Sequence, residues 1–225
     1  MFKTIYLIKG SEMESYEDYF KRITNSANGL ANNTRIPKIR VVFTKEPPPK
    51  ISIIPFKKSK IASISLYGEN ETLVDDLLDL QGFTGAYQVT EALPVAYEKT
   101  WPDGEITPGA CLLTLFNRKK GLDHETFIHR WHNSHTPLSL KIHPLWNYSR
   151  NVVEKLLTDR TIPFEGIVEE QVRTDGDLLN PFRFFGNPLV IIPRMVSVYT
   201  DTKSFLDYGN IETYMAREIV VKAVI

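Results

Sequence analysis

The feature that most constrains the fold is an order of strand and helix patterns that occurs twice along the chain. In the first half, β-branched and aromatic runs predict strands at residues 4–8, 39–44, 61–67 and 85–91. Apolar residues at helical spacing predict helices from Ser15 to about 29 and over 72–80. The order β-α-β-β-α-β is typical of a ferredoxin-like unit, an antiparallel sheet with two helices on one face.

The second half repeats this order. Strands are expected at 110–117, 146–153, 164–172 and 217–224, and helices from 123 to about 134 and from about 202 to 208. The stretch 101–109 is dense in turn residues and predicts a linker. We therefore expect an α+β fold of two tandem ferredoxin-like repeats packed sheet to sheet, with a degenerate repeat at 1–100 and a second repeat at 110–225.

Charge excludes several function classes. The chain has 225 residues, with 27 basic and 27 acidic side chains and 42% hydrophobic residues. The charges also balance within each half, so neither half attracts a phosphate backbone or an anionic lipid surface. We expect no nucleic-acid partner and no membrane partner, and this composition does not predict disorder.

The single cysteine, Cys111, forms no internal disulfide, and no leader peptide or apolar run of membrane-spanning length is evident. A cytoplasmic location is the expectation, with Cys111 as a small buried apolar residue. One further segment, 180–188, is apolar and interrupted by proline and glycine. It is either a lid or an irregular packed loop.

All five histidines fall within the twenty residues from His124 to His143. On the expected helix, Phe127, Trp131 and His135 stand at i, i+4 and i+8 and share one face. If Ser15 and Asp123 are equivalent helix caps, Ala27 in the first half corresponds in sequence to His135 in the second. The first half therefore lacks this imidazole. The asymmetry favours a functional His135 over a core histidine, although both interpretations stay open, as does its protonation state.

Three of the histidines also permit a metal hypothesis. His129, His132 and His135 spread over an arc of about 120° on the helix and do not converge on one ion without another element. A solvated histidine face is the simpler interpretation, and we expect no metal.

The strand after this helix offers polar side chains on alternate residues. Trp146, Tyr148, Arg150 and Val152 share one face, and Asn147, Ser149 and Asn151 share the other. Tyr148 and Arg150 beside His135 would suit a phenolic, enolic or carbonyl oxygen. The alternative is structural, with Arg150 paired to a carboxylate such as Glu169. No phosphate loop, nucleophile elbow or dinucleotide fingerprint is present.

The motifs of the second half resemble the EthD-domain family, which is named for ethyl tert-butyl ether degradation and belongs to the dimeric α+β barrel group. The matching stretches are Lys120 to Asp123, Phe127-x3-Trp131-x3-His135-x-Pro137-Leu138, Tyr148 to Asn151 and Phe164 to Ile167. The stretch from Val89 to Leu112 looks like the two-repeat members. The resemblance implies an intramolecular α+β barrel, with His135, Trp131 and Tyr148 lining a cleft between helix and sheet.

What the resemblance implies for function is a cofactor-independent, monooxygenase-like oxidoreductase that acts on a small hydrophobic oxygenated or aromatic compound. His135 is the expected general acid or base, with Tyr148 and Arg150 as its catalytic partners. The expected substrate contacts are Phe127, Trp131, Trp146, Asn151 and Glu169. The alternatives are a cyclase or dehydratase type of lyase, a non-catalytic protein that binds a hydrophobic ligand, and a haem protein with His135 as axial ligand. A monomer or a homodimer is expected.

Overall fold

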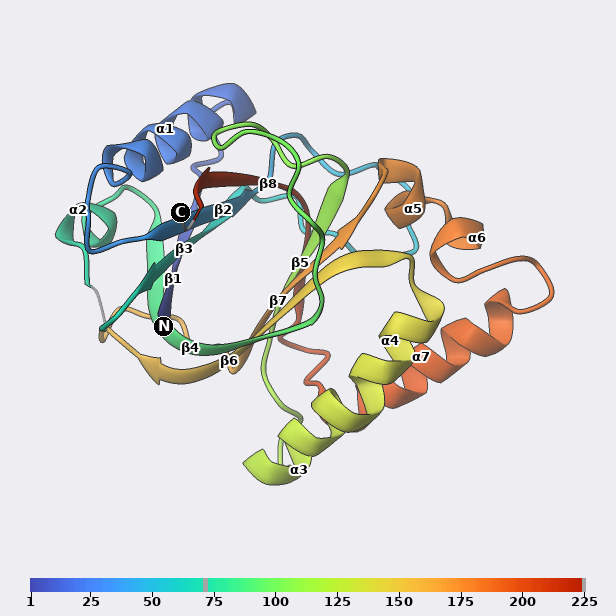
Figure 1. Ribbon diagram of the computed structural model, residues 1–225. Helices are drawn as coiled ribbons and strands as arrows, with labels where there is room; N and C mark the ends of the chain where they lie inside the picture. Colours follow the sequence, from blue (N-terminus) through green and yellow to red (C-terminus); the bar gives the residue numbers. More distant parts are fainter. Residues whose placement is uncertain (71–72, 224–225) are drawn as a thin grey trace.

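The computed structural model describes residues 1–70 and 73–223. Eight antiparallel strands form one closed barrel in the order β1-β3-β2-β8-β5-β7-β6-β4. Figure 1 shows the barrel with α1 and α2 on one side and a layer of longer helices on the other. The expected α+β barrel is therefore confirmed, and its halves follow one another in the ring of strands.

The first half supplies four strands and two helices. Their bounds are β1 Phe2–Lys9, α1 Tyr16–Gly29, β2 Lys38–Phe43, β3 Ile61–Gly68, α2 Asp75–Leu78 and β4 Phe83–Val95. Helix α1 begins where Ser15 accepts a hydrogen bond from the backbone N–H of Asp18, as the capping pattern predicts. Residue 72, where the second helix was expected to begin, lies outside the described residues, as does residue 224 at the end of the last expected strand.

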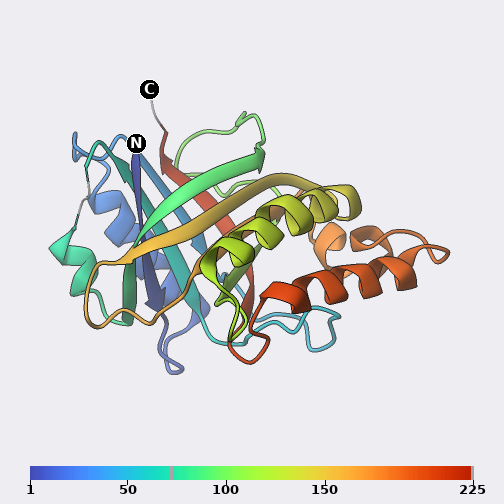
Figure 2. The same ribbon diagram turned by 90° about the horizontal axis from the view of Figure 1, so that it is seen from below.

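The second half is longer because its helices are longer and more numerous. Its elements are β5 Ala110–Phe116, α3 His124–His129, η1 Arg130–His135, α4 Thr136–Ile142, β6 Leu145–Leu156, β7 Gly166–Val172, α5 Asp175–Leu179, α6 Pro181–Phe184, α7 Ile191–Phe205 and β8 Glu212–Lys222. Segments α3, η1 and α4 run on as one helix, which lies beside α7 against the barrel (Figure 2).

Two expectations need correction. The sheets of the two halves do not simply stack face to face, because β2 pairs with β8 and β4 pairs with β6, so hydrogen bonds close the ring at both junctions. The helix expected over 202–208 is α7, which starts eleven residues earlier, at Ile191. Ile192, Val196 and Tyr199 on its outer face are at least half exposed, which hides the amphipathic pattern.

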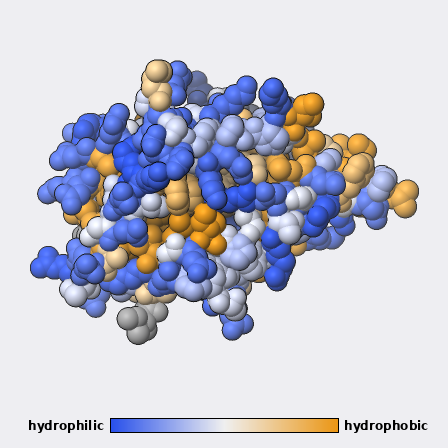
Figure 3. Space-filling view, turned by 90° about the horizontal axis from the view of Figure 1, so that it is seen from above, coloured by the Kyte–Doolittle hydropathy of each residue, from blue (hydrophilic) through white to orange (hydrophobic). Residues whose placement is uncertain are grey.

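Apolar side chains also gather on the surface where α6 and α7 meet. Leu189 is 89% exposed, and Phe182 and Ile192 are also exposed. The space-filling view shows hydrophobic surface at the right-hand end of the molecule (Figure 3). The segment 180–188, expected to be either a lid or a packed loop, thus contributes helix α6 and part of this apolar end.

The barrel interior is apolar at its centre and ionic toward the end covered by residues 96–109. Arg40 is 4% exposed and donates to Glu218 with Nε at 2.9 Å, while its Nη2 lies 3.3 Å from Glu169. Lys3, 2% exposed, lies 2.7 Å from Glu91. Burial opposes ionisation of Glu91, yet the nearby cations Lys3 and Arg40 lower its pKa to about 2. The charges therefore depend on one another for compensation.

This dependence is testable by replacing Arg40 with Met. The variant leaves Glu218 and Glu169 buried without their guanidinium, and breaking a buried pair from one side costs about 3–5 kcal/mol. Urea unfolding measures the loss. Lys21→Met is the control, because Lys21 pairs with Glu17 on the exposed face of α1 and its removal should not shift the transition measurably. Similar transitions for the two variants would contradict the account.

Candidate functional site

A cavity of about 480 Å³ lies outside the barrel, between the sheet of the second half and its helices. Its floor comes from β5, β6, β7 and β8, and its walls come from η1, α4, α7 and the segment around Ile54. Small-molecule sites occupy about 300–1,000 Å³, so the volume suits one small ligand. Most of the lining is apolar or aromatic, and it includes Leu112, Phe116, Trp131, Val168, Phe184 and Phe205.

The wall that carries His135 is a π-helical turn. Pro137 has no N–H and its ring would clash with the carbonyl four residues earlier, so an unbroken α-helix is unfavourable here. The chain instead widens over Arg130–His135, and the N–H of Thr136 donates to the carbonyl of Trp131, five residues back. The Thr136 hydroxyl donates to the same carbonyl at 2.9 Å. Turns of this kind occur frequently at functional sites.

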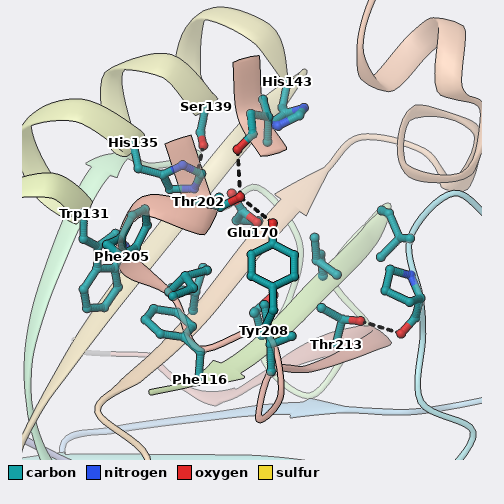
Figure 4. A pocket seen from close by; sticks show the side chains of 18 of the residues that line it. Phe116, Trp131, His135, Ser139, His143, Glu170, Thr202, Phe205, Tyr208 and Thr213 are labelled. Atoms are coloured by element: carbon teal, nitrogen blue, oxygen red, sulfur yellow. Dashed lines mark hydrogen bonds between the residues drawn. The ribbon is translucent and has the colours of Figure 1, made fainter. Parts of the chain in front are cut away.

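His135 is held between two partners. Its Nδ1 lies 2.8 Å from Asp201 Oδ2 on α7, and its Nε2 lies 3.1 Å from the hydroxyl of Ser139. Burial alone would raise the pKa of Asp201, but hydrogen bonds from His135 and Ser134 lower it. An ionised Asp201 only accepts, so Nδ1 of His135 carries the proton and Nε2 is the basic nitrogen. Figure 4 shows His135 and Ser139 together at one wall.

Glu170 is the second ionisable group of the cavity. It lies on the outer face of β7, is 9% exposed and makes no hydrogen bond or ion pair with any residue in the described ranges. Burial raises the pKa of Glu170 to about 7, against a smaller opposing influence of His135. The carboxyl group therefore shifts between neutral and charged forms near neutral pH, in an apolar site.

His143, at the end of α4, also lines the cavity. Its Nδ1 lies 3.1 Å from the carbonyl oxygen of Phe184, and its ring stacks on the Phe184 ring with centroids 4.0 Å apart. Burial lowers the pKa of His143 to about 4, although the contact with that carbonyl acts in the opposite direction. His143 is therefore neutral near pH 7.

The structure brings together three of the residues expected at the site. His135, Trp131 and Tyr148 all line the cavity. Arg150 does not: it donates to the Thr136 hydroxyl at 2.7 Å and so supports the π-helical turn from behind. Phe127 is fully buried in the aromatic core under Trp131, with their ring centroids 5.6 Å apart.

The other three expected residues lie elsewhere. Trp146 packs against Tyr97 and Trp101 at the covered end of the barrel. Asn151 and Glu169 point into the barrel, where Asn151 accepts from Lys3 at 2.8 Å. The suggested pair of Arg150 and Glu169 is therefore wrong, since strand alternation places the two side chains on opposite faces of the sheet.

The polar residues of the site that sequence reasoning missed include Ser139, His143, Glu170 and Asp201. Glu170 had a usable signal, because in the buried strand Glu169-Glu170-Gln171 the middle residue must face the side opposite its neighbours. Asp201 had none, because more than sixty residues separate it from its partner His135. Among the described residues, no group of three or more His, Cys, Asp or Glu side chains is placed to hold a metal ion.

Comparison with known proteins is informative at the level of structure. No family model matches the chain, and no curated protein matches it by sequence. Among solved structures, an anthrone oxidase-like protein aligns with a TM-score of 0.60 and 7% identity over 100% of this chain and 94% of its own. A Fusobacterium nucleatum protein provisionally named a monooxygenase aligns with a TM-score of 0.54 and 9% identity, covering 98% and 92%. At such identities the likeness shows a shared fold.

No described helix combines the length and apolar character needed to cross a membrane.

The burial of Glu170 predicts how stability depends on pH. Its pKa rises from 4.5 in the unfolded chain to about 7 in the fold, so the folded state favours the protonated form. That advantage is complete below pH 4.5 and is lost as the pH rises to about 7, which amounts to about 3 kcal/mol. Glu170→Gln removes this pH dependence. The free energy of unfolding of the variant, relative to that of the wild type, should therefore rise by about 3 kcal/mol between pH 4 and pH 8.

Urea unfolding across this pH range measures the difference. Glu154→Gln, at an exposed position of β6, is the matched control and should follow the wild type. A constant difference between Glu170→Gln and the wild type from pH 4 to pH 8 would show that the carboxyl group of Glu170 is not buried as described.

Proposed function

We propose that the protein is a cofactor-independent oxidoreductase of the monooxygenase-like kind, which acts on a small hydrophobic oxygenated or aromatic compound. The observation that carries this proposal is the opening of an oriented base, His135 with Asp201, onto an apolar cavity of about 480 Å³. A base inside a largely apolar cavity suits proton removal from a weakly acidic carbon or phenol.

The chemistry requires only the protein, the substrate and molecular oxygen. Nε2 of His135 accepts a proton from an activated methylene group, and Asp201 stabilises the imidazolium that forms. The resulting carbanion reduces O2. Oxidation of a methylene group to a carbonyl removes four electrons, which O2 accepts, so one oxygen atom enters the product and the other leaves as water.

The surrounding side chains have distinct roles in this proposal. Trp131 and Phe205 supply a flat apolar wall for an aromatic ring. Tyr148 lies 1% exposed at the floor, where its hydroxyl would approach a substrate oxygen. Burial raises the pKa of Tyr148, so it remains a neutral donor. Arg150 acts indirectly, by holding Thr136 and through it the turn that carries His135.

The family interpretation belongs to the same proposal. The EthD-like motifs of the second half and the barrel shared with the two structural neighbours support membership of the dimeric α+β barrel group. Within each half the strands lie in the order fourth, first, third, second, which supports two tandem ferredoxin-like repeats over 1–100 and 110–225, joined by the linker 101–109. We also propose a cytoplasmic protein that is a monomer or a homodimer.

The competing functions differ in what they require of His135. A lyase of the cyclase or dehydratase type would use the same base without consuming oxygen. A binding protein would release its ligand unchanged. A haem protein would need Nε2 of His135 for the iron, and this, like proton transfer in the proposed reaction, means giving up the 3.1 Å contact with Ser139.

Anthrone is the test substrate, because it is a tricyclic aromatic ketone with an acidic methylene group. We expect the protein to convert anthrone and O2 to anthraquinone and water. His135→Gln should lower kcat/KM by about 10²–10⁴-fold, since it removes the base. Asp201→Asn should also lower kcat/KM strongly, because an amide favours the wrong tautomer. An oxygen electrode and product absorbance measure turnover.

His129→Gln provides the control, because His129 is exposed, does not line the cavity and hydrogen-bonds with Asn133. It should behave as the wild type. Undiminished turnover in His135→Gln would remove the proposed base, and turnover without oxygen consumption would favour the lyase.

A further inference from the structure

Glu170 is a buried carboxyl group with no partner in the described part of the chain. Its neighbours on β7, Glu169 and Gln171, face the barrel interior, whereas Glu170 faces the cavity. No oxygen of Glu170 is among the enclosed side-chain atoms of the described residues that lack a partner, so its carboxyl group opens onto the cavity. A carboxyl group that has no protein partner and opens onto a largely apolar cavity is placed to meet a ligand.

The first half of the chain shows what a structural residue looks like at this position. With Ser15 and Asp123 as equivalent helix caps, Thr4 on β1 corresponds to Leu112 on β5. Leu112 pairs with Glu170, and Thr4 pairs with Leu66. Leu66 is 2% exposed and packs in the core under α1. An apolar side chain thus satisfies the fold at this position, so the carboxyl group of Glu170 is not needed for packing.

The charges around Glu170 come from few elements. The ionisable residues that line the cavity with it are His135 from η1, His143 from the end of α4, Tyr148 from β6, and Tyr208 and Lys57 at the rim; Asp201 of α7 lies behind His135. Of these, only His135 affects the ionisation of Glu170 appreciably. Strand β5 contributes Leu112, Thr114 and Phe116 to the cavity, none of which is charged.

We propose that Glu170 is a second catalytic residue of this cavity, which in its neutral form donates a hydrogen bond to the carbonyl oxygen of a ketone substrate while His135 removes the proton. This inference rests on the proposed function and narrows its substrate class to ketones whose carbonyl is conjugated with the acidic carbon.

The step balances without a further reagent. The C–H bond breaks and its proton moves to Nε2 of His135. The electron pair of that bond delocalises onto the carbonyl oxygen, which becomes an enolate. The O–H of Glu170 strengthens its hydrogen bond to this oxygen as the charge develops, and the enolate then reduces O2 as described above.

The neutral form fits this role better than the charged form. Burial raises the pKa of Glu170 to about 7, so a large share of the molecules hold a protonated carboxyl at neutral pH. A carboxylate at the same place would repel an enolate and would have no donor to offer it. Activity should therefore decrease as Glu170 ionises.

Two variants separate the roles of the side chain. Glu170→Gln keeps a hydrogen-bond donor that does not titrate, and Glu170→Leu reproduces the residue of the first half, Leu66. We expect Glu170→Gln to oxidise anthrone within about tenfold of the wild type below pH 6 and to lack the decline of kcat/KM above pH 7. We expect Glu170→Leu to lose about 10²–10³-fold in kcat. Circular dichroism and thermal unfolding establish that both variants are folded.

A binding measurement keeps this inference separate from the oxidation itself. Anthraquinone carries the carbonyl group but no acidic carbon, so its binding requires no turnover. Its affinity for the wild type should fall about tenfold per pH unit above the pKa of Glu170, and this fall should be absent in Glu170→Gln. Glu154→Gln is again the control and should follow the wild type.

The outcomes are distinguishable. If anthrone is not oxidised but the alkaline loss of anthraquinone affinity disappears in Glu170→Gln, the oxidase proposal fails and the carbonyl donor stands. If anthrone is oxidised and Glu170→Gln keeps the alkaline decline in both measurements, the role of Glu170 is wrong while the oxidase stands. Failure of the wild type to bind anthraquinone at any pH would also overturn the inference.

Discussion

Most strand residues of this barrel are buried on both faces, and this constraint decides where each polar side chain can act. One face of each strand points into a closed interior, and much of the other face lies under helices, apart from stretches of β4 and β6 where residues such as Thr90 and Glu154 are exposed. A polar residue on a covered stretch is therefore buried on either side. Two consecutive residues of β7 show the consequence: Glu169 lies with the barrel cations, whereas Glu170 opens onto the cavity.

The cavity exists because the second half fills its outer face less completely than the first. Under α1, Tyr6, Leu66 and Ala27 pack tightly in an apolar core. The positions that correspond to them by strand register and helix cap carry Thr114, Glu170 and His135, which line the cavity. Threonine stands where the first half has tyrosine, which leaves more volume, and two ionisable groups stand where the first half has apolar side chains. The same fold thus carries a packed core on one side and a polar, partly empty site on the other.

The π-helical turn adds the orientation that chemistry requires. Because Pro137 disfavours a continuous α-helix, the backbone widens at the residues that include Trp131 and His135. His135 then meets Asp201 on α7, an element that has no counterpart of similar length in the first half. The ionic cluster of Arg40, Lys3 and their carboxylates lies on the other side of the sheet, inside the barrel, and does not line the cavity.

Much of this could be predicted from the sequence, and the failures have physical causes. Runs of β-branched and aromatic residues located the strands, and Ser15 and Asp123 marked the helix starts that the structure shows. The i, i+4 stripe placed Trp131 and His135 on one helix face, the family resemblance implied that they line a cleft, and both line the cavity. The prediction that Phe127 contacts the substrate is not supported, because Phe127 is fully buried in the core. A helix face that covers a sheet includes core residues as well as site residues.

The strand positions failed for a different reason. Alternation indicates that Asn151 and Arg150 face opposite sides, but it does not indicate which side holds the cavity. Trp146 lies near a register shift in β6, where the alternation is interrupted. Asp201 depends on a contact between distant segments, and such a contact has no local pattern in the sequence.

The central claim is that the cavity between the second-half sheet and the helices η1, α4 and α7 is where an apolar ketone binds. A crystal structure of the protein with anthraquinone tests it most directly. The account predicts the ligand against Trp131 and Phe205, with a carbonyl oxygen at about 2.5–3.0 Å from the carboxyl group of Glu170. Anthraquinone bound elsewhere, or a cavity filled by its own side chains in the complex, would contradict it.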